Sequence, residues 1–355
     1  MKWLTALVIS SLVMAAPALA GSPRKPALEA RMAALEAEGD DEIGLHVREL
    51  GAGDGAEESG ERFGWRDDET WYLASLIKVP VAVELLARAE AGELSLDERL
   101  VLSESDYVDG AGPTNWAEPG TALALRELLE PMLTESDNTA SDLLIARLGL
   151  AAVNRRAERL SGGGLGPITT LLEVRREAYG HLHPEARGLT GMDFILLRRA
   201  EEEAARLDAL VETLTVPRSA LALPSLDAAF EAYYDSGLNA GRLDAYGELL
   251  AAIGEGRALG PAATAELLTI MGATASGDHR LKAGLGPDIR FAHKTGTQHR
   301  RSCDAGIAFH GQGAAEHRVV VVACTRGERD TERSEHLLRE VGRALRETGL
   351  FGPAR

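Results

Sequence analysis

Residues 75–78 have the sequence Ser75-Leu76-Ile77-Lys78, and this stretch decides how the rest of the chain is interpreted. It follows a strand-like segment and begins an apolar one, so we predict an internal helix from Ser75 to about Ala91. Pro80 falls near the first turn of that helix, where a missing N–H costs least. Serine and lysine three residues apart share one helix face, so the Lys78 amine can point at the Ser75 hydroxyl. A helix start also favours an oxyanion and helps the lysine to lose its proton.

The serine-to-lysine spacing is a weak signal by itself. Ser22-Pro23-Arg24-Lys25 has the same spacing, and most such pairs are surface decoration. The lysine content argues for a role, because the chain has only five lysines against thirty-three arginines. Two of the five lie in short motifs with serine or threonine: Lys78 in the present one and Lys294 in the third motif below. Arginine does not give up its proton and cannot act as a base, so lysine is chemically required there.

A second motif, Ser136-Asp137-Asn138, lies between two helix-like stretches. Its simplest interpretation is a helix N-cap, a position that these residue types favour. A functional interpretation is compatible with the cap. The hydroxyl can relay a proton to a leaving nitrogen, and the amide can hold a substrate carbonyl together with the Lys78 amine.

A third motif, Lys294-Thr295-Gly296-Thr297, ends a predicted strand. Glycine leaves room for a ligand backbone beside the strand, and lysine and threonine side chains bind carboxylates. The alternative is a charged edge strand that resists aggregation. That alternative explains the lysine but not the glycine between two threonines.

Strand-like segments occur near both ends of the chain, and helical patterns fill the middle. Five segments have strand-like patterns: 43–47, 61–65, 290–297, 303–310 and 318–325. An amphipathic helix follows at 331–348, with Leu337, Leu338, Val341 and Leu345 as its apolar stripe. We therefore predict one antiparallel sheet built from both ends of the chain, with a helical subdomain inserted into it.

The three motifs in this order are similar to those of the class A serine β-lactamases and penicillin-binding proteins. The resemblance extends from about Glu42 to Leu345 and includes Gly120-Thr121, Leu125-Arg126-Glu127-Leu128 and Arg280-Leu281. The 61 residues between the first two motif serines suit that family. The 158 residues from Ser136 to Lys294 are more than it usually has.

The resemblance implies an α/β (α+β) fold, with a five-stranded antiparallel sheet flanked by N- and C-terminal helices and an inserted all-helical subdomain. The implied division is a signal peptide at 1–20 and a catalytic domain at 21–355. Within that domain the α/β part covers about 27–98 and 260–355, and the helical part about 99–259. The additional length falls at about 174–238, where it either covers the site or, as we favour, decorates the helical subdomain.

The same resemblance implies a serine hydrolase that opens the β-lactam amide through an acyl-Ser75 intermediate. The implied catalytic residues are Ser75, Lys78, Ser136, Glu173 and Lys294. The implied substrate-binding residues are Asn138, Thr295, Gly296, Thr297 and Trp116. Backbone N–H groups of Ser75 and Thr297 would form the oxyanion hole, and neither a metal nor another cofactor is expected. The alternatives are a D-Ala-D-Ala peptidase or esterase of the same fold, and a non-catalytic module that binds β-lactams or cell-wall peptides.

Two of these assignments depart from the family pattern or have a simpler explanation. Glu173 falls where the family has the glutamate that activates water for deacylation. The proline and asparagine that usually follow are replaced by Val174 and Glu177. If Glu173 is not the base, acylation would be fast and release slow. Trp116 is either an aromatic gate of the cleft or a packing residue.

Composition and the first residues predict an exported protein. Lys2, the apolar run from Leu4 to Met14 and Ala18-Leu19-Ala20 have the pattern of a secretory signal, although a buried helix is an alternative. We expect a periplasmic or secreted monomer that acts on a small molecule, a β-lactam or a D-Ala-D-Ala-like peptide. The net charge of −17 argues against nucleic acid and, after signal cleavage, against membrane attachment.

The two cysteines, Cys303 and Cys324, lie on neighbouring strand-like segments. They would face each other if these segments form an antiparallel hairpin, and an oxidising compartment would permit a disulfide. Two separate buried thiols are the alternative that we favour at this stage, because the geometry of the pair does not follow from the sequence.

Overall fold

The computed structural model describes residues 24–51, 60–313, 316–327 and 330–351, and the signal peptide predicted at 1–20 lies outside them. At the centre is a five-stranded sheet with the order β2-β1-β9-β8-β7, in which every neighbouring pair is antiparallel. Its strands are β1 Glu42–Leu50, β2 Arg62–Trp65, β7 Arg290–Gln298, β8 Arg301–His310 and β9 His317–Arg326. The predicted sheet is confirmed, and each strand overlaps its predicted segment.

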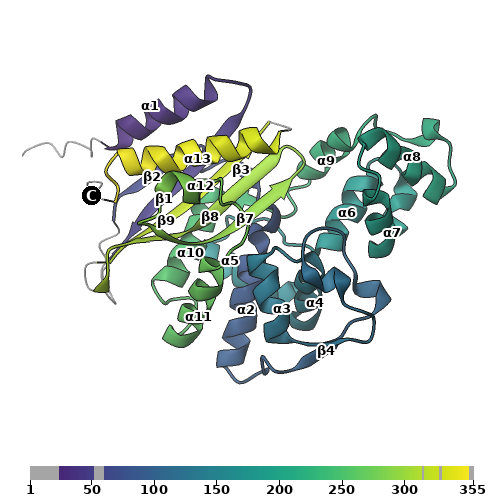
Figure 1. The fold of residues 1–355 in the computed structure, drawn as a ribbon, viewed down its shortest axis with the longest axis horizontal. Coiled ribbons are helices and arrows are strands. Elements are labelled where there is room, and N and C mark those ends of the chain that lie inside the picture. The colour runs from purple at the N-terminus through teal and green to yellow at the C-terminus, as the bar shows by residue number, and fades with distance from the viewer. Residues whose placement is uncertain (1–23, 52–59, 314–315, 328–329, 352–355) are drawn as a thin grey trace, which may run out of the picture.

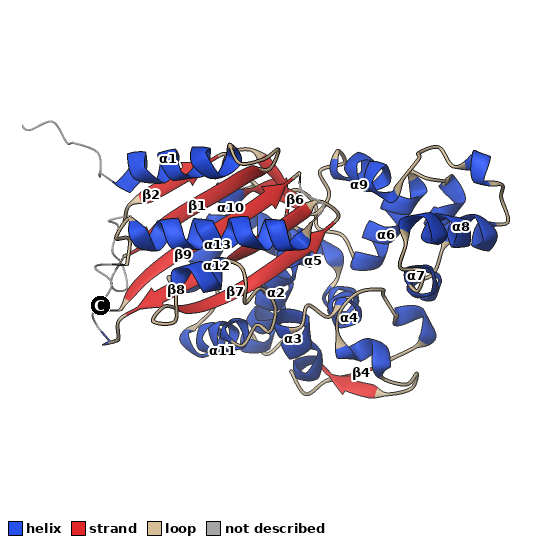
Figure 2. Cartoon of the chain, turned by 45° about the horizontal axis from the view of Figure 1, so that its top comes forward, coloured by secondary structure: helices blue, strands red, loops and turns tan. Residues whose placement is uncertain are grey.

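Helices cover both faces of this sheet, as Figures 1 and 2 show. On one face lie α1 Arg24–Glu36, α12 Leu281–Leu285 and α13 Thr331–Glu347. The apolar stripe of α13 is buried there against Ile43, Val319 and Val321, which confirms the predicted amphipathic helix. The opposite face packs on α2 Lys78–Glu90, α10 Leu243–Gly254 and α11 Pro261–Gly272. Because both faces are covered, β9 is apolar along nearly its whole length and does not alternate.

The remaining helices form the predicted helical subdomain beside the sheet (Figure 1). They are α3 Leu125–Thr134, α4 Asn138–Leu148, α5 Leu150–Ser161, α6 Leu171–Gly180, α7 Gly191–Arg198, α8 Glu203–Leu214 and α9 Leu226–Tyr234. Two short antiparallel pairs were not predicted: β3 Thr70–Tyr72 with β6 Ala240–Arg242, and β4 Arg99–Val101 with β5 Ala122–Ala124. Within the described parts of the chain, no helix is long and apolar enough to cross a bilayer.

Helices α6 to α9, which hold the additional length, have an apolar core of their own. It includes Phe194, Leu210 and Phe230, and it continues onto Tyr72 next to the first motif. The segment is also fixed to the sheet, because the Tyr234 hydroxyl donates a hydrogen bond to the His299 carbonyl at 2.8 Å. The Phe230 ring stacks on the His299 ring with centroids 4.2 Å apart. Helix α9 is therefore attached to the end of β7, close to the third motif.

The two cysteines form a disulfide across the β8–β9 pair. Cys303 lies directly opposite Cys324 in the strand register, and the structure joins them. The expectation of two separate thiols is therefore wrong. The pairing of β8 with β9 sets the distance between these cysteines, and a sequence pattern does not specify which residues of two strands are partners.

Removing this disulfide should destabilise the protein without removing its fold. The bond closes a loop with a sequence separation of 21 residues, so the loop-entropy model gives a loss of about 3 kcal/mol for the Cys303→Ser, Cys324→Ser variant. Urea unfolding of oxidised wild type, reduced wild type and the double variant measures it. Equal midpoints for the oxidised and reduced wild type would contradict the prediction.

Candidate active site

Ser75 lies in a tight turn ahead of a buried helix, and not inside the helix as predicted. The turn is the 3₁₀ segment Ala74–Ile77, and α2 begins only at Lys78. Ala74 has a φ of 49°, in the left-handed region, which turns the chain sharply at the serine. Ser75 is half-exposed, whereas every other residue from 71 to 86 is buried. Within the described residues the Ser75 hydroxyl has no hydrogen-bond partner, so it is available to a ligand.

The Lys78 amine is fully buried, and among the described residues its hydrogen bonds go to the second motif and not to the Ser75 hydroxyl, at which it was predicted to point. Its Nζ donates hydrogen bonds to the Ser136 carbonyl at 2.6 Å, the Ser136 hydroxyl at 3.1 Å and Asn138 Oδ1 at 2.7 Å. Burial lowers the pKa of Lys78 to about 7, although the charges of Asp137 and Asp142 act in the opposite direction. A lysine with this pKa is partly neutral near pH 7, and a neutral amine can accept a proton.

The second motif both caps a helix and contacts the lysine. Asp137 is the N-cap of α4, and its carboxylate accepts hydrogen bonds from the backbone N–H groups of Ala140 at 2.8 Å and Thr114 at 2.7 Å. Ser136 has a φ of 62°, which turns its carbonyl and hydroxyl toward the Lys78 amine. The cap interpretation is confirmed, and the cap fixes the turn that presents Ser136 and Asn138 to the Lys78 amine, while the proton relay and the substrate contact stay predictions.

The third motif lies on β7 directly beside the turn that holds Ser75. A side chain at Gly296 would place its Cβ 2.7 Å from the Leu73 carbonyl and 3.3 Å from the Ser75 nitrogen. The glycine is therefore needed for the close approach of the chain's own backbone, in addition to any ligand. It brings β7 into contact with the turn that holds Ser75, and the oxyanion hole formed by the N–H groups of Ser75 and Thr297 stays a prediction.

Lys294 is buried, and its Nζ donates a hydrogen bond to the Thr295 carbonyl at 3.0 Å. Burial and the nearby charge of Lys78 hold the pKa of Lys294 well below its usual value. Arg280, which precedes α12, reaches the same place and donates to the Thr297 hydroxyl at 2.8 Å and the Gly296 carbonyl at 3.1 Å. It supplies a permanent positive charge beside the threonines.

One cavity of about 510 Å³ joins the three motifs. The predicted residues on its wall are Ser75, Ser136, Asn138, Thr295 and Thr297. Lys78, Lys294 and Gly296 are not on the wall but lie directly behind it, in contact with residues that are. The structure thus brings eight of the predicted site residues together around one space.

Glu173 is not brought to this cavity. It lies in the first turn of α6, its side chain is 42% exposed, and its nearest ion-pair partner is Arg176 at 3.9 Å. The cavity wall carries two other carboxylates, Asp109 and Glu135. Asp109 accepts a hydrogen bond from Arg175 at 2.6 Å, and Glu135 is exposed. The role of Glu173 as a deacylating base stays a prediction that this position does not support.

Trp116 is also absent from the wall of this cavity. Its side chain is 87% exposed, and it lines an adjoining cavity of about 980 Å³ together with Met192 and Ile195. The two cavities share Asp109, Gly110 and Arg198. A packing role for Trp116 is excluded by its exposure, and a position at the outer mouth of the cleft fits a gate.

The rest of the cavity wall was not predicted, and the additional helices supply much of it. The residues that these helices contribute are Arg175, Tyr179, Arg198, Arg206 and Phe230. The preference for a decorative role of this segment is therefore wrong, because four of its helices reach the cavity that holds Ser75. No local signal marks these residues, since arginines and aromatics at helical spacing are common on ordinary helix faces.

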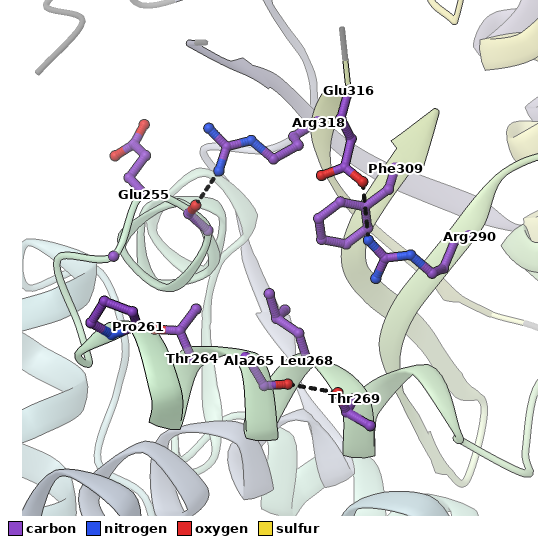
Figure 3. A pocket seen from close by; sticks show the side chains of 12 residues that line it. Glu255, Pro261, Thr264, Ala265, Leu268, Thr269, Arg290, Phe309, Glu316 and Arg318 are labelled. Carbon is purple, nitrogen blue, oxygen red and sulfur yellow. Dashed lines mark hydrogen bonds and ion pairs between the residues drawn. The ribbon is translucent and has the colours of Figure 1, made fainter. Parts of the chain in front are cut away.

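A further cavity of about 510 Å³ lies on the other side of the molecule between α10, α11 and the strands (Figure 3). Its charged groups are already paired: Arg290 contacts Glu316 at 3.3 Å, and Arg318 donates to the Gly254 carbonyl at 2.7 Å. The Arg290 guanidinium also lies 3.8 Å from the centre of the Phe309 ring. None of the described residues that line it is a serine, lysine or cysteine, so this cavity has no nucleophile–base pair.

Comparison with known sequences finds one family over most of the chain. Residues 27–348 match the model of the Beta-lactamase enzyme family. A β-lactamase of Streptomyces albus G is 27% identical over 328 residues, which are 90% of this chain and 84% of that protein. A β-lactamase of Rhodobacter capsulatus is 35% identical over 140 residues, 39% of this chain. The match spans 44% of the length of that relative, and a match to a β-lactamase of Amycolatopsis lactamdurans spans 41%.

Solved structures share the fold along almost the whole chain. A β-lactamase from Sphaerobacter thermophilus DSM 20745 has a TM-score of 0.66 at 24% identity, covering 93% of this chain and 99% of that one. A class A β-lactamase described as the last common ancestor of Gram-negative bacteria has a TM-score of 0.65 at 24% identity, covering 90% and 98%. An acyl-enzyme complex of a PBP-A mutant with penicillin G has a TM-score of 0.63 at 22% identity, covering 91% and 95%. At these identities the comparison establishes the β-lactamase/transpeptidase fold.

Proposed function

The chain belongs to the Beta-lactamase enzyme family, and from this premise we propose that it hydrolyses the amide of β-lactams through an acyl-enzyme on Ser75. One observation carries the proposal. The buried Lys78 amine, with a pKa of about 7, contacts Ser136 and Asn138 behind the cavity into which the unpartnered Ser75 hydroxyl is exposed. A candidate nucleophile, a candidate base and a candidate proton relay thus belong to one site.

In the acylation step the neutral Lys78 amine takes the proton of Ser75 while the serine oxygen attacks the amide carbonyl. Ser136, 3.1 Å from Lys78 Nζ, then gives its own proton to the departing nitrogen and takes in return the proton that Lys78 received from Ser75. The backbone N–H groups of Ser75 and Thr297 bind the developing oxyanion, and each such donor is worth about 3 kcal/mol of barrier. Water afterwards attacks the ester and releases the acid.

The carboxylate of the substrate binds at the third motif. The hydroxyls of Thr295 and Thr297 face the cavity, and Arg280 contacts Thr297 from behind at 2.8 Å. An incoming carboxylate favours the protonated form of Lys294, because it opposes the burial that lowers the pKa of that amine. The site thereby gains positive charge when an anionic substrate arrives.

Two measurements test the proposal: peptide mass spectrometry after incubation with a penicillin, and hydrolysis of a chromogenic cephalosporin. The expected result is a covalent adduct on Ser75 and continued release of hydrolysed product. If neither adduct nor hydrolysis is found with folded protein, the proposal is wrong. The leader-like residues 1–20 and the Cys303–Cys324 disulfide support an enzyme that works in an oxidising compartment outside the cytosol.

The placement of Glu173 favours a second candidate, a D-Ala-D-Ala peptidase. β-Lactams would acylate such an enzyme, and the acyl group would be released slowly. A carboxylate that is 42% exposed and absent from the cavity wall is poorly placed to activate water at the acyl-serine. Comparing turnover of a D-Ala-D-Ala peptide with turnover of the cephalosporin separates the two candidates. Faster release of D-alanine would favour the peptidase.

We expect Glu173→Gln to change the deacylation rate by less than about twofold, because the general-base effect of roughly 10²–10⁴ requires hydrogen-bond reach of the reacting water. Pre-steady-state mass spectrometry of the acyl-enzyme gives this rate directly. Glu177→Gln is the matched control, since Glu177 lies one turn further along α6 and pairs with Arg187 at 3.2 Å. Acyl-enzyme that accumulates only in the Glu173 variant would contradict the expectation and restore Glu173 as the base.

A further inference from the structure

The cavity that holds Ser75 is positively lined, although the chain as a whole is acidic. With a net charge of −17, the chain still places four arginines on this wall: Arg175, Arg198, Arg206 and Arg300. The wall has only two carboxylates, and Asp109 is already bound to Arg175 at 2.6 Å. An excess of positive charge in a cleft attracts anions and raises their local concentration.

Three of these arginines come from the additional helices and form what we call the arginine wall. Arg175 lies on α6, Arg198 in the last turn of α7 and Arg206 on α8. Arg206 donates to the Ala200 carbonyl at 2.9 Å, a contact that fixes the guanidinium without neutralising its charge. Among the described residues neither Arg198 nor Arg206 forms an ion pair, so both charges are available to a ligand.

The arginine wall is held in a fixed relation to the catalytic residues. Besides the Tyr234 and Phe230 contacts with His299, Arg301 pairs with Glu231 of α9 at 2.7 Å. The charges of the arginine wall also affect the pKa of a residue at the end of β7. Burial lowers the pKa of His299 at the end of β7, and the charges of Arg175 and Arg206 add to this against the effect of Asp227. The guanidinium groups are thus within electrostatic range of the third motif.

The two sides of the cavity suit two different parts of one substrate. The side with Thr295, Thr297 and Arg280 takes the carboxylate next to the scissile amide, as proposed above. A substrate with its carboxylate at these threonines and its scissile carbonyl at Ser75 would extend its acyl portion along the remaining wall of the cavity, which the arginines line. Guanidinium groups bind carboxylates through paired, charge-assisted hydrogen bonds, and Tyr179 and Phe230 add aromatic surface beside them.

We propose that the arginine wall is a second anion subsite, which selects acyl donors that carry a free carboxylate on the acyl side chain. The inference rests on the proposed acyl-serine function and names the substrate class for it. Among β-lactams, penicillins with an acidic side chain would be preferred over their neutral counterparts. Among peptides, those with a carboxylate on the acyl side of the scissile bond would be preferred.

Benzylpenicillin and carbenicillin test the proposal, because they differ by one carboxylate on the acyl side chain. The measured quantity is the ratio of their second-order acylation rate constants, carbenicillin over benzylpenicillin, from the growth of the covalent adduct. Arg198→Glu should lower this ratio roughly fivefold or more, because the glutamate repels the second carboxylate of carbenicillin in addition to the one that both penicillins carry. Arg198 is exposed and has no ion pair among the described residues, so the variant should fold.

Arg199→Glu is the matched control. Arg199 is the next residue, and it is exposed. It lines the adjoining cavity that contains Trp116, but not the cavity that contains Ser75. The two variants change the net charge equally. A ratio that is unchanged in Arg198→Glu overturns the proposal. An equal loss in both variants also overturns it, because that would show a general field and not a subsite.

A binding measurement keeps this test separate from the proposed function. Calorimetric affinities of both penicillins for Ser75→Ala, and for Ser75→Ala combined with Arg198→Glu, require no acylation. If wild type forms no adduct while the affinities depend on Arg198, the acyl-serine function is wrong and the subsite stands. If adducts form but neither rates nor affinities depend on Arg198, the subsite alone is wrong.

Discussion

Replacement of Ser75 by alanine is expected to abolish adduct formation with penicillins and to lower turnover by several orders of magnitude. Removal of a serine nucleophile in another serine hydrolase costs on the order of 10⁶ in kcat. Alanine at this position leaves no oxygen to form the ester, and no neighbouring side chain replaces it, because Ser136 already contacts the Lys78 amine. Intact-protein mass spectrometry and cephalosporin hydrolysis measure both effects.

The substitution should leave the fold intact. Ser75 is half-exposed, and its hydroxyl has no partner among the described residues, so thermal unfolding should be unchanged within about a degree. Ser95→Ala, at an exposed serine beyond the C-terminal end of α2, is the control. Continued turnover at the wild-type rate in Ser75→Ala would refute the acyl-enzyme mechanism, whatever the nature of the substrate.

The second large effect is expected at Lys78. Lys78→Arg keeps a positive donor near Ser136 and Asn138 but removes the group that can accept a proton. We expect the acylation rate to fall by about 10²–10⁴, the usual contribution of a general base. Lys78→Met removes the positive charge in addition to the base, and its acylation rate should fall by the same factor. Lys282→Arg is the control, because Lys282 is half-buried outside the cavity that holds Ser75 and pairs with Asp278 at 2.8 Å.

The pH dependence identifies the amine independently of the size of the loss. Burial lowers the pKa of Lys78 to about 7, so the neutral, proton-accepting form dominates above that pH. Wild-type acylation should therefore rise as pH increases through about 7 and level off above it. In Lys78→Arg this rise should disappear. A profile that is flat in the wild type, or one that persists in the variant, would assign the base to another group.

Much of the fold follows from local patterns that survive in the sequence. The apolar run of β9 and the apolar stripe of α13 predict their elements, because a strand covered on both faces and a helix on a sheet must bury these side chains. The short pair of β3 with β6 was missed for the opposite reason. Each strand has three residues, and the helices α2 to α9 separate the two strands in the sequence, so no local pattern indicates that they pair.

The candidate site also has one part that could be predicted from the sequence and one part that could not. The motifs of Ser75, Ser136 and Lys294 were found because each chemistry requires particular residue types at fixed short spacings. The arginine wall was not found, because Arg175, Arg198 and Arg206 lie on three different helices and face the serine only in the folded chain. The position of Glu173 was also beyond sequence, since the start of α6 decides whether its carboxylate points inward.

The order of residues alone determined the sheet, the helical insertion and the pairing of the motif serine with its lysine. These depend on periodicity and on chemistry that a few neighbouring residues carry. The packing of distant segments decided the disulfide, the lowered pKa of Lys78 and the charge that faces the acyl side of a substrate. Distance and burial between residues far apart in the chain set these properties, and they exist only once the helices close over the edge of the sheet.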